Sequence, residues 1–273
     1  MATRGVERSR AGTMLSKVPE VTVYFWVIKV MATTVGETAA DFLNTNLHLG
    51  LTGTTVVMSA LLAGVLVAQF RAPAYVPGIY WLAVVLISIV GTLITDNLTD
   101  HFGVSLWLST GLFAVALIVT FTVWHAKEGT LSIHSIFTRR REGFYWLAIL
   151  FTFALGTAAG DLIAEKLNLG YWKSALMFAA VIAIVALAWK LARLNAVLAF
   201  WLAYILTRPL GASIGDYLSQ PRSDGGRGLG TAGASAIFLA TILALVVYLA
   251  RSRRDQITLL PGELSDASAG PLD

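Results

Sequence analysis

Residues 145–161 read YWLAILFTFALGTAAGD, and the same pattern returns three more times along the chain. The other copies are FWVIKVMATTVGETAAD at 25–41, YWLAVVLISIVGTLITD at 80–96 and FWLAYILTRPLGASIGD at 200–216. In each copy a Gly follows ten residues after the Trp, and an Asp follows five residues after that Gly. Fixed spacing in four copies is typical of tandem structural repeats.

Each copy lies in an apolar segment long enough to cross a bilayer, and a second such segment follows it. A span needs about 20 largely apolar residues, and eight segments qualify: 21–43, 50–70, 76–98, 103–124, 143–164, 170–192, 195–218 and 229–250. The second segment of each copy opens near a glycine (Gly50, Gly103, Gly170 and Gly230). The sequence therefore predicts an all-α, polytopic membrane bundle of eight transmembrane helices, arranged as four helical hairpins.

The spacing of the copies also predicts their relative direction. Successive Asp residues are separated by 55, 65 and 55 positions, so the half 21–125 maps on the half 143–250 with a shift of 120. Each copy has two spans, which means that all four copies cross the membrane in the same sense, as parallel repeats.

The composition excludes several classes of protein. Hydrophobic residues make up 56% of the 273 residues and charged residues 13%, against about 25% charged in a soluble domain. There is no Cys for a disulfide or a thiolate site. Since no Walker A, HExxH or Gly-x-Ser-x-Gly motif occurs, we expect no enzymatic activity and no cofactor. The basic residues flank the spans, so we expect the lipid bilayer as partner and no nucleic acid.

Basic residues predict the orientation. With the N-terminus inside, the inside segments hold 14 Lys and Arg and the outside loops hold 4, which is the bias of cytoplasmic loops. Residues 1–20 are then a basic cytoplasmic N-terminus and 126–142 a basic cytoplasmic loop. Residues 251–273 are predicted to be a disordered cytoplasmic tail. Both termini are expected in the cytoplasm, and the oligomeric state stays open.

The chain resembles a bacterial family of multi-pass membrane proteins that are built from four tandem two-helix repeats, each with a characteristic Trp. The family is described as a repeat of unknown function, in membrane-anchored proteins without an assigned role. The resemblance covers about residues 20–250. It implies the repeat fold and a location in the bacterial inner membrane, and it transfers no activity.

Two sets of repeated residues have structural interpretations. Trp favours the headgroup level of a membrane, so we interpret the four repeated Trp as interface anchors: Trp26, Trp81, Trp146 and Trp201. Small residues spaced by four let helices approach closely in lipid. We therefore predict a packing seam at Gly36, Gly91, Gly156, Gly160, Gly211 and Gly215, close to a central axis.

The repeated acids have two interpretations. Asp41, Asp96, Asp161 and Asp216 lie fifteen residues after the Trp, about 22 Å along a helix, and should form a ring in the outer third of the membrane. Intramembrane acids mark ion paths. Alternatively, each Asp hydrogen-bonds the adjoining turn and braces the end of its helix.

Charges that are not repeated make the copies unequal. Glu37 lies four residues before Asp41, and Lys29 continues that stripe towards the start of the helix. Arg208 lies far from both ends of its segment and is followed by Pro209. We predict that Lys29 and Arg208 are charge partners of the acids, with snorkelling towards the cytoplasmic interface as the alternative. Pairing with Glu37 or an Asp is expected for Arg208 more than for Lys29.

Two functions remain open. The first is a secondary transporter or exporter of small cations, protons or a divalent metal, in which the acid ring and Glu37 bind the ion and the two halves rock. The second is a structural or sensory membrane protein in which the Asp residues brace helices. Loop residues His48, His101, Asp100 and Glu165 could hold a metal, but their spacing matches no metal signature and we interpret them as solvated.

Overall fold

The structure, a computed structural model, describes residues 16–46, 49–167 and 169–256, and this part of the chain is almost entirely helical. A π-helical turn, η1 (Asn97–His101), continues the third long helix, and two loops contain short 3-10 turns, η2 (Ile133–Ser135) and η3 (Arg222–Asp224). The eight long helices are α2 (Val23–Asn46), α3 (Gly50–Arg71), α4 (Pro77–Asp96), α5 (Leu106–Glu128), α6 (Arg139–Leu167), α7 (Tyr171–Leu191), α8 (Ala196–Ser219) and α9 (Gly230–Ser252). The all-α prediction is confirmed. The segment 1–15 of the basic N-terminus, the segment 257–273 of the tail and His48 lie outside the described residues.

Seven of these helices, α3 to α9, are long and apolar enough to cross a membrane, so the chain is an integral multi-pass membrane protein. α2 is equally long but less apolar, because it carries Lys29, Glu37 and Asp41 among several Thr. It packs against α4, α8 and α9, and an enclosed helix needs little apolar surface. The crossing of the membrane by α2 stays a prediction.

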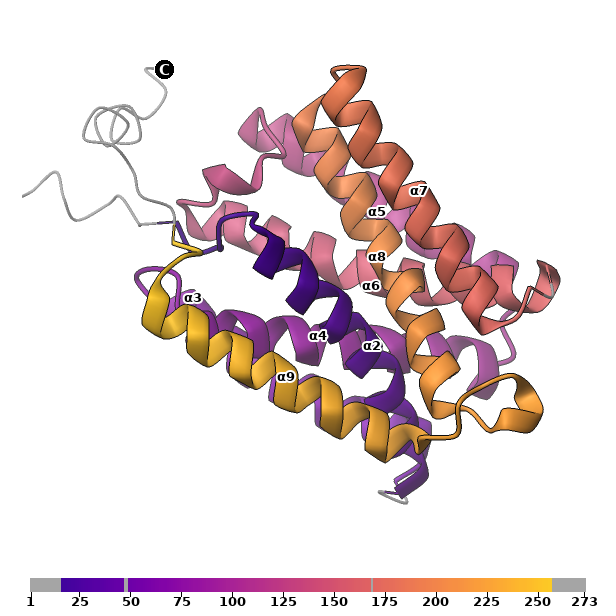
Figure 1. Cartoon of the computed structure of the whole chain (residues 1–273). Coiled ribbons are helices and arrows are strands. Elements are labelled where there is room, and N and C mark those ends of the chain that lie inside the picture. Colours follow the sequence, from indigo (N-terminus) through magenta and orange to yellow (C-terminus); the bar gives the residue numbers. More distant parts are fainter. Residues whose placement is uncertain (1–15, 47–48, 168, 257–273) are drawn as a thin grey trace, which may run out of the picture.

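The helices form two layers around one axis (Figure 1). The first helices of the four repeats, α2, α4, α6 and α8, pack on one another in that order, and α8 closes the ring on α2. The second helices, α3, α5, α7 and α9, form the outer layer. In the apolar windows of these outer helices 11% to 28% of residues are buried, against 50% to 78% in α4, α6 and α8.

Each outer helix packs mainly on the inner helix of the next repeat. α3 lies on α4, α5 on α6 and α7 on α8, while α9 returns to α2. In Figure 1, α9 lies beside α2, although the two helices come from opposite ends of the sequence. The two helices of one repeat make few contacts with each other, so the unit that packs is an inner helix with the outer helix of the preceding repeat.

The four repeated glycines before the outer helices have left-handed backbone conformations. Gly50, Gly103, Gly170 and Gly230 have φ between +67° and +73°, a region that an L-residue with a Cβ enters only at a cost of about 1–2 kcal/mol. The repeated glycine therefore has the same left-handed φ in all four repeats, and this explains why glycine recurs at this position.

Both described chain ends lie at one end of the bundle, which we call the terminal end. Lys17 forms a fully buried ion pair with Glu142 of α6 at 2.7 Å, and its ammonium donates to the carbonyl of Phe70 at 3.0 Å. The backbone N–H of Glu20 donates to the carbonyl of Asp255 at 2.9 Å. Lys17 thus joins the N-terminal segment to α3 and α6, and the contact between Glu20 and Asp255 joins the two described ends of the chain. The inner helices run from here towards the opposite, aspartate end, where the repeated Asp residues lie.

Candidate functional site

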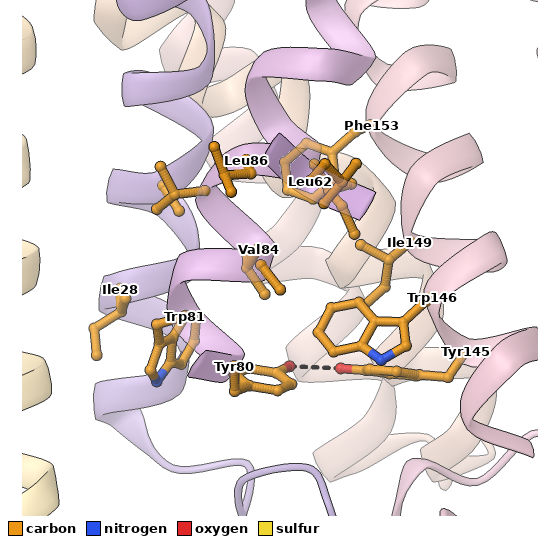
Figure 2. Close-up of a cluster of buried hydrophobic side chains, with 14 of the residues drawn as sticks. Ile28, Leu62, Tyr80, Trp81, Val84, Leu86, Tyr145, Trp146, Ile149 and Phe153 are labelled. Carbon is orange, nitrogen blue, oxygen red and sulfur yellow. Dashed lines mark hydrogen bonds between the residues drawn. The ribbon is translucent and has the colours of Figure 1, made fainter. Parts of the chain in front are cut away.

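An aromatic layer lies at the beginning of the inner helices. The first aromatic residue of each repeat contacts the Trp of the next repeat: Phe25 contacts Trp81, Tyr80 contacts Trp146, Tyr145 contacts Trp201 and Phe200 contacts Trp26, with ring centroids 5.4–6.4 Å apart. Figure 2 shows the part of this layer that contains Tyr80, Trp81, Tyr145 and Trp146. The same pairing at all four junctions shows that the repeats are related by a cyclic, parallel arrangement.

The interface-anchor interpretation is wrong for three of the four Trp. Trp81, Trp146 and Trp201 are 1%, 3% and 4% exposed, because aromatic residues of neighbouring helices enclose their rings, so they are shielded from the surface of the bundle. Trp26 is partly exposed and lines an apolar cavity of about 590 Å³ between α2, α7, α8 and the loop at 131–134. Trp201 donates its indole N–H to the carbonyl of Leu131 at 3.0 Å.

The glycine seam is confirmed, and it too is cyclic. A Cβ on Gly36 would meet Ser88 of α4, one on Gly91 would meet Phe153 of α6, one on Gly156 would meet Arg208 of α8, and one on Gly211 would meet Thr33 of α2. In each case the residue met stands eight positions before the Asp of the next repeat. A Cβ on Gly160 would meet Pro209, and one on Gly215 would meet Thr34 and Thr38.

Arg208 lies across the axis and contacts all three other inner helices. Its guanidinium forms an ion pair with Glu37 at 2.8 Å and donates to the carbonyl of Thr33 at 2.9 Å. It also donates to the hydroxyls of Thr92 and of Thr157, the latter at 2.7 Å. Glu37, Thr92 and Thr157 occupy one repeat position, four residues before each Asp. The predicted pairing of Arg208 with Glu37 is confirmed.

In the fourth copy, Ala212 occupies the position four residues before the Asp. A guanidinium offers five donors in a rigid fork and stays protonated in proteins, so it can hold three helices at once. Arg208 is fully buried and Glu37 nearly so. Removal of one partner of such a buried charge pair strongly destabilises the folded protein, because the other charge is left buried and uncompensated.

Lys29 lies on the other side of Arg208, towards the terminal end. Its ammonium lies 3.9 Å from the centroid of the Phe153 ring and 4.2 Å from that of Tyr204. It is 1% exposed, and none of the salt bridges within the described residues involves it. Its predicted pairing with an acid is therefore wrong: two aromatic faces surround its charge, an arrangement that attracts cations.

The repeated Asp residues gather at the aspartate end, beyond the Arg208 layer. The carboxyl group of Asp96 lies within electrostatic range of Glu37, Asp161 and Asp41, and that of Asp216 within range of the same three. All four Asp are half-buried. The structure thus brings the predicted ion-binding residues together as one acidic cluster.

Three of these carboxylates have no direct partner among the described residues. Asp41, Asp96 and Asp216 accept no hydrogen bond and form no ion pair through their side chains within the part of the chain that the structure describes. Arg208, the arginine that lies at the axis in the described part of the chain, is already paired with Glu37. Asp161 does interact with other groups.

Metal-binding clusters are absent from residues 16–46, 49–167 and 169–256, where no three His, Asp or Glu side chains are arranged to hold an ion. His101 and Asp100 are exposed on the turn that follows α4. The acidic cluster in this arrangement is better suited to a proton, which needs one carboxylate oxygen, than to a metal ion that needs several ligands at once.

Sequence reasoning missed the buried tyrosines of the axis. Tyr80 and Tyr145 stand one residue before the repeated Trp, and Tyr204 stands four residues beyond its Phe200. A signal was present, because the first and fourth repeats have Phe where the second and third have Tyr. Their hydroxyls meet only in the folded ring, where those of Tyr80 and Tyr145 lie 2.5 Å apart.

Comparison with known families agrees with the repeat structure. The family model described as Repeat of Unknown Function (DUF347) matches the chain four times, at residues 24–75, 79–130, 144–195 and 199–255. Each match contains one inner helix and the outer helix that follows it. No curated protein and no solved structure matches the chain significantly.

Proposed function

The chain belongs to the family of the Repeat of Unknown Function (DUF347), and from the geometry of its four copies we propose that it is a secondary transporter of small cations, with the proton as the cation that its site fits best. The acidic cluster of Asp41, Asp96, Asp161 and Asp216 receives the cation from the aspartate end of the bundle. Glu37 and Arg208 form the layer below it.

One observation carries this proposal: the carboxylates of Asp41, Asp96 and Asp216 lack a hydrogen bond or ion pair with any described residue. An acid that braced the end of a helix would accept hydrogen bonds from the adjoining turn. A carboxylate in a membrane segment costs a few kcal/mol and is kept where it serves an ion path. Half-buried acids without a partner are therefore more consistent with a site that binds and releases a cation.

Charge balance supports the same interpretation. The four repeated stretches 25–41, 80–96, 145–161 and 200–216 contain five acids, the four repeated Asp and Glu37, and two bases, Lys29 and Arg208. Arg208 neutralises Glu37, and Lys29 lies between aromatic rings. Since like charges that share a site oppose each other's ionisation, the remaining acids hold protons or attract cations.

The closed ring favours local opening over the rocking of the two halves 21–125 and 143–250. α5 of the first half packs on α6 of the second, and α9 of the second half packs on α2 of the first. Rocking would separate both of these contacts. Exchange of the Arg208 guanidinium between Glu37 and a cluster Asp would instead open the axis with a side-chain movement.

The alternative is a structural or sensory membrane protein without a transport cycle. The observation that favours it is the filled axis, where Arg208, Lys29 and Phe153 are fully or almost fully buried. In that case the Arg208 contacts with Glu37, Thr92 and Thr157 serve to hold the ring together.

The deciding experiment compares flux and stability in the same variants. Asp96→Asn and Asp161→Asn keep the shape and hydrogen-bonding capacity of the side chain but remove its charge. Reconstituted in vesicles, both are expected to lose cation flux while their melting temperatures stay at or above that of the wild type. Asp224→Asn, in the exposed η3 loop, is the matched control and should transport normally.

Two results contradict the proposal. Wild-type vesicles without flux of H⁺, Na⁺, Mg²⁺, Mn²⁺ or Zn²⁺ would exclude transport of these cations. Normal flux in both Asn variants would exclude the acidic cluster as the cation site. Loss of stability in these variants without any ion-dependent effect would support the structural alternative.

A further inference from the structure

Four tyrosines lie between the axis and the terminal end. Tyr80, Tyr145 and Tyr204 are 0% exposed, and Tyr75, in the loop before α4, is 8% exposed. They come from three inner helices and one loop, so only the folded ring brings them together. Beyond Tyr75 lies the carboxylate of Asp255, which is 1% exposed.

Direct contacts link these groups at two points. The hydroxyls of Tyr80 and Tyr145 share a hydrogen bond of 2.5 Å, and Figure 2 shows them pointing at each other below Trp146. The hydroxyl of Tyr75 donates to Oδ2 of Asp255 at 2.5 Å. Burial, together with the hydrogen bond to Asp255, raises the pKa of Tyr75 above its ordinary value, so this hydroxyl keeps its proton and remains a donor.

The remaining members lie near one another without a direct hydrogen bond between their hydroxyls among the described residues. The rings of Tyr75 and Tyr80 lie edge to face with centroids 5.6 Å apart, and Tyr145 and Tyr204 are within electrostatic range of each other. At the axis, the ammonium of Lys29 lies 4.2 Å from the centroid of the Tyr204 ring.

Packing does not require the hydroxyls. Tyr80 and Tyr145 occupy the repeat position that Phe25 and Phe200 occupy in the first and fourth copies, and the aromatic contacts there are equivalent. A buried hydroxyl costs free energy unless it is hydrogen-bonded. Two tyrosines where phenylalanine fits therefore point to a role for the oxygen atoms.

Free hydrogen-bonding positions lie at both ends of the series. The hydroxyl of Tyr204 and Oδ1 of Asp255 are buried without a hydrogen-bond partner among the described residues. Buried Tyr hydroxyls usually have a partner. These two atoms are the places where a proton or a water molecule can enter and leave.

We propose that Tyr204, Tyr145, Tyr80 and Tyr75 form a hydroxyl relay that carries protons between the axis at Lys29 and the carboxylate of Asp255 at the terminal end. The inference rests on the proposed function. It gives the path of the proton between Arg208 and the terminal end, whereas the acidic cluster lies between Arg208 and the aspartate end. Tyr145 and Tyr80 exchange a proton directly through their shared hydrogen bond, and so do Tyr75 and Asp255. Between Tyr204 and Tyr145, and between Tyr80 and Tyr75, no direct hydrogen bond joins the hydroxyls within the described residues, so the proposed relay includes a bridging water molecule at each of these two steps. At each step an oxygen accepts a proton from one neighbour and releases its own to the next. Rotation of the hydroxyls then restores the series, so no residue changes its charge overall.

Proton flux in vesicles tests the relay. The full-length protein is reconstituted with a pH-sensitive dye inside, and a potassium diffusion potential drives protons inward. Positioned proton-transfer groups contribute about 10²–10⁴-fold to a rate, so Tyr80→Phe/Tyr145→Phe and Tyr75→Phe should each reduce flux at least about tenfold. Tyr248→Phe, on the outer helix α9 and 39% exposed, is the matched control and should keep the wild-type flux.

The outcomes separate this inference from the proposed function. Wild-type flux with unchanged flux in the Tyr→Phe variants overturns the relay and leaves the acidic cluster as the transport site. Absence of proton flux in the wild type overturns the relay and the choice of the proton as the cation, and absence of flux for Na⁺, Mg²⁺, Mn²⁺ and Zn²⁺ as well overturns the proposed function. If the double variant does not fold, Tyr75→Phe and Asp255→Asn decide, because both residues lie in segments between or after the helices. Reduced flux at the wild-type melting temperature supports the relay, and wild-type flux rejects it.

Discussion

Replacing Gly156 with Ala tests whether the glycine seam holds the inner ring together. The new Cβ would lie 2.5 Å from both Cβ and Cγ of Arg208 and 3.3 Å from Cδ of Pro209. These neighbours cannot withdraw easily, because the Arg208 guanidinium is held by Glu37 and by three further groups and Pro209 has a restricted backbone. α6 and α8 must therefore separate slightly.

The magnitude follows from two opposing effects. Overpacking of a well-packed site costs about 1–3 kcal/mol, and the fixed neighbours place Gly156 at the upper end of that range. Ala in a helix interior is more favourable than Gly by about 1 kcal/mol. The net expectation is a loss of about 2 kcal/mol in the free energy of unfolding, or a melting temperature lower by about 4–8 °C.

Gly64 in the outer helix α3 provides the matched control. A Cβ at this exposed position has no heavy atom within 4 Å, so Gly64→Ala should retain only the helix-propensity gain of about 1 kcal/mol. The two variants should thus differ by about 3 kcal/mol, with opposite signs relative to the wild type.

The assay is denaturant-induced unfolding of the purified full-length variants in mixed micelles, with thermal melting as a second readout. Equal stabilisation of Gly156→Ala and Gly64→Ala would refute the reasoning, because it would mean that α6 and α8 are not in close contact at Gly156.

Three further predictions concern the buried pair, the inter-helix turn and the orientation. Arg208→Met leaves the carboxylate of Glu37 without its partner and should lower the free energy of unfolding by about 3–5 kcal/mol; the double variant Arg208→Met/Glu37→Met should recover most of this loss in the same unfolding assay, and no recovery would argue against the pairing. Gly170→Ala forces a Cβ into a backbone with φ of +73° and should cost about 1–2 kcal/mol, whereas Gly233→Ala, in the helical first turns of α9 with open space around it, should be neutral or stabilising by thermal melting. A reporter fused after residue 254 should read cytoplasmic, as should one in 127–141, while a reporter in 219–228 should read external; an external reading after residue 254 would contradict the prediction of eight crossings.

The repeat and its local consequences were predictable from the sequence. Four copies with one spacing predicted the all-α membrane fold, the parallel sense of the copies and the close approach at Gly36, Gly91, Gly156 and Gly211. These features depend on helix periodicity and on the size of a side chain, which are properties of the chain within a few turns. The glycines at the start of the outer helices were recognisable in the same way, although their left-handed conformation is a feature of the folded chain alone.

The burial of the aromatic residues could not be predicted in this way. Trp at the beginning of a membrane helix is typical of an interface anchor. The sequence does not indicate which residue of a neighbouring helix packs over the Trp ring. Trp81, Trp146 and Trp201 are buried because each inner helix receives the aromatic residue of the preceding repeat. That covering depends on the order of the helices around the axis.

Charge partners were predictable only as alternatives. Arg208 had Glu37 and four Asp within its possible reach, and Lys29 had the same acids. In the ring, Arg208 meets Glu37 while Lys29 meets the rings of Phe153 and Tyr204. Sequence spacing defines the height of each residue along its own helix, but the partner across the axis follows from which helices become neighbours. That order arises when the last outer helix, α9, packs on the first inner helix, α2, and closes the ring, a contact between residues about two hundred positions apart that no local pattern encodes.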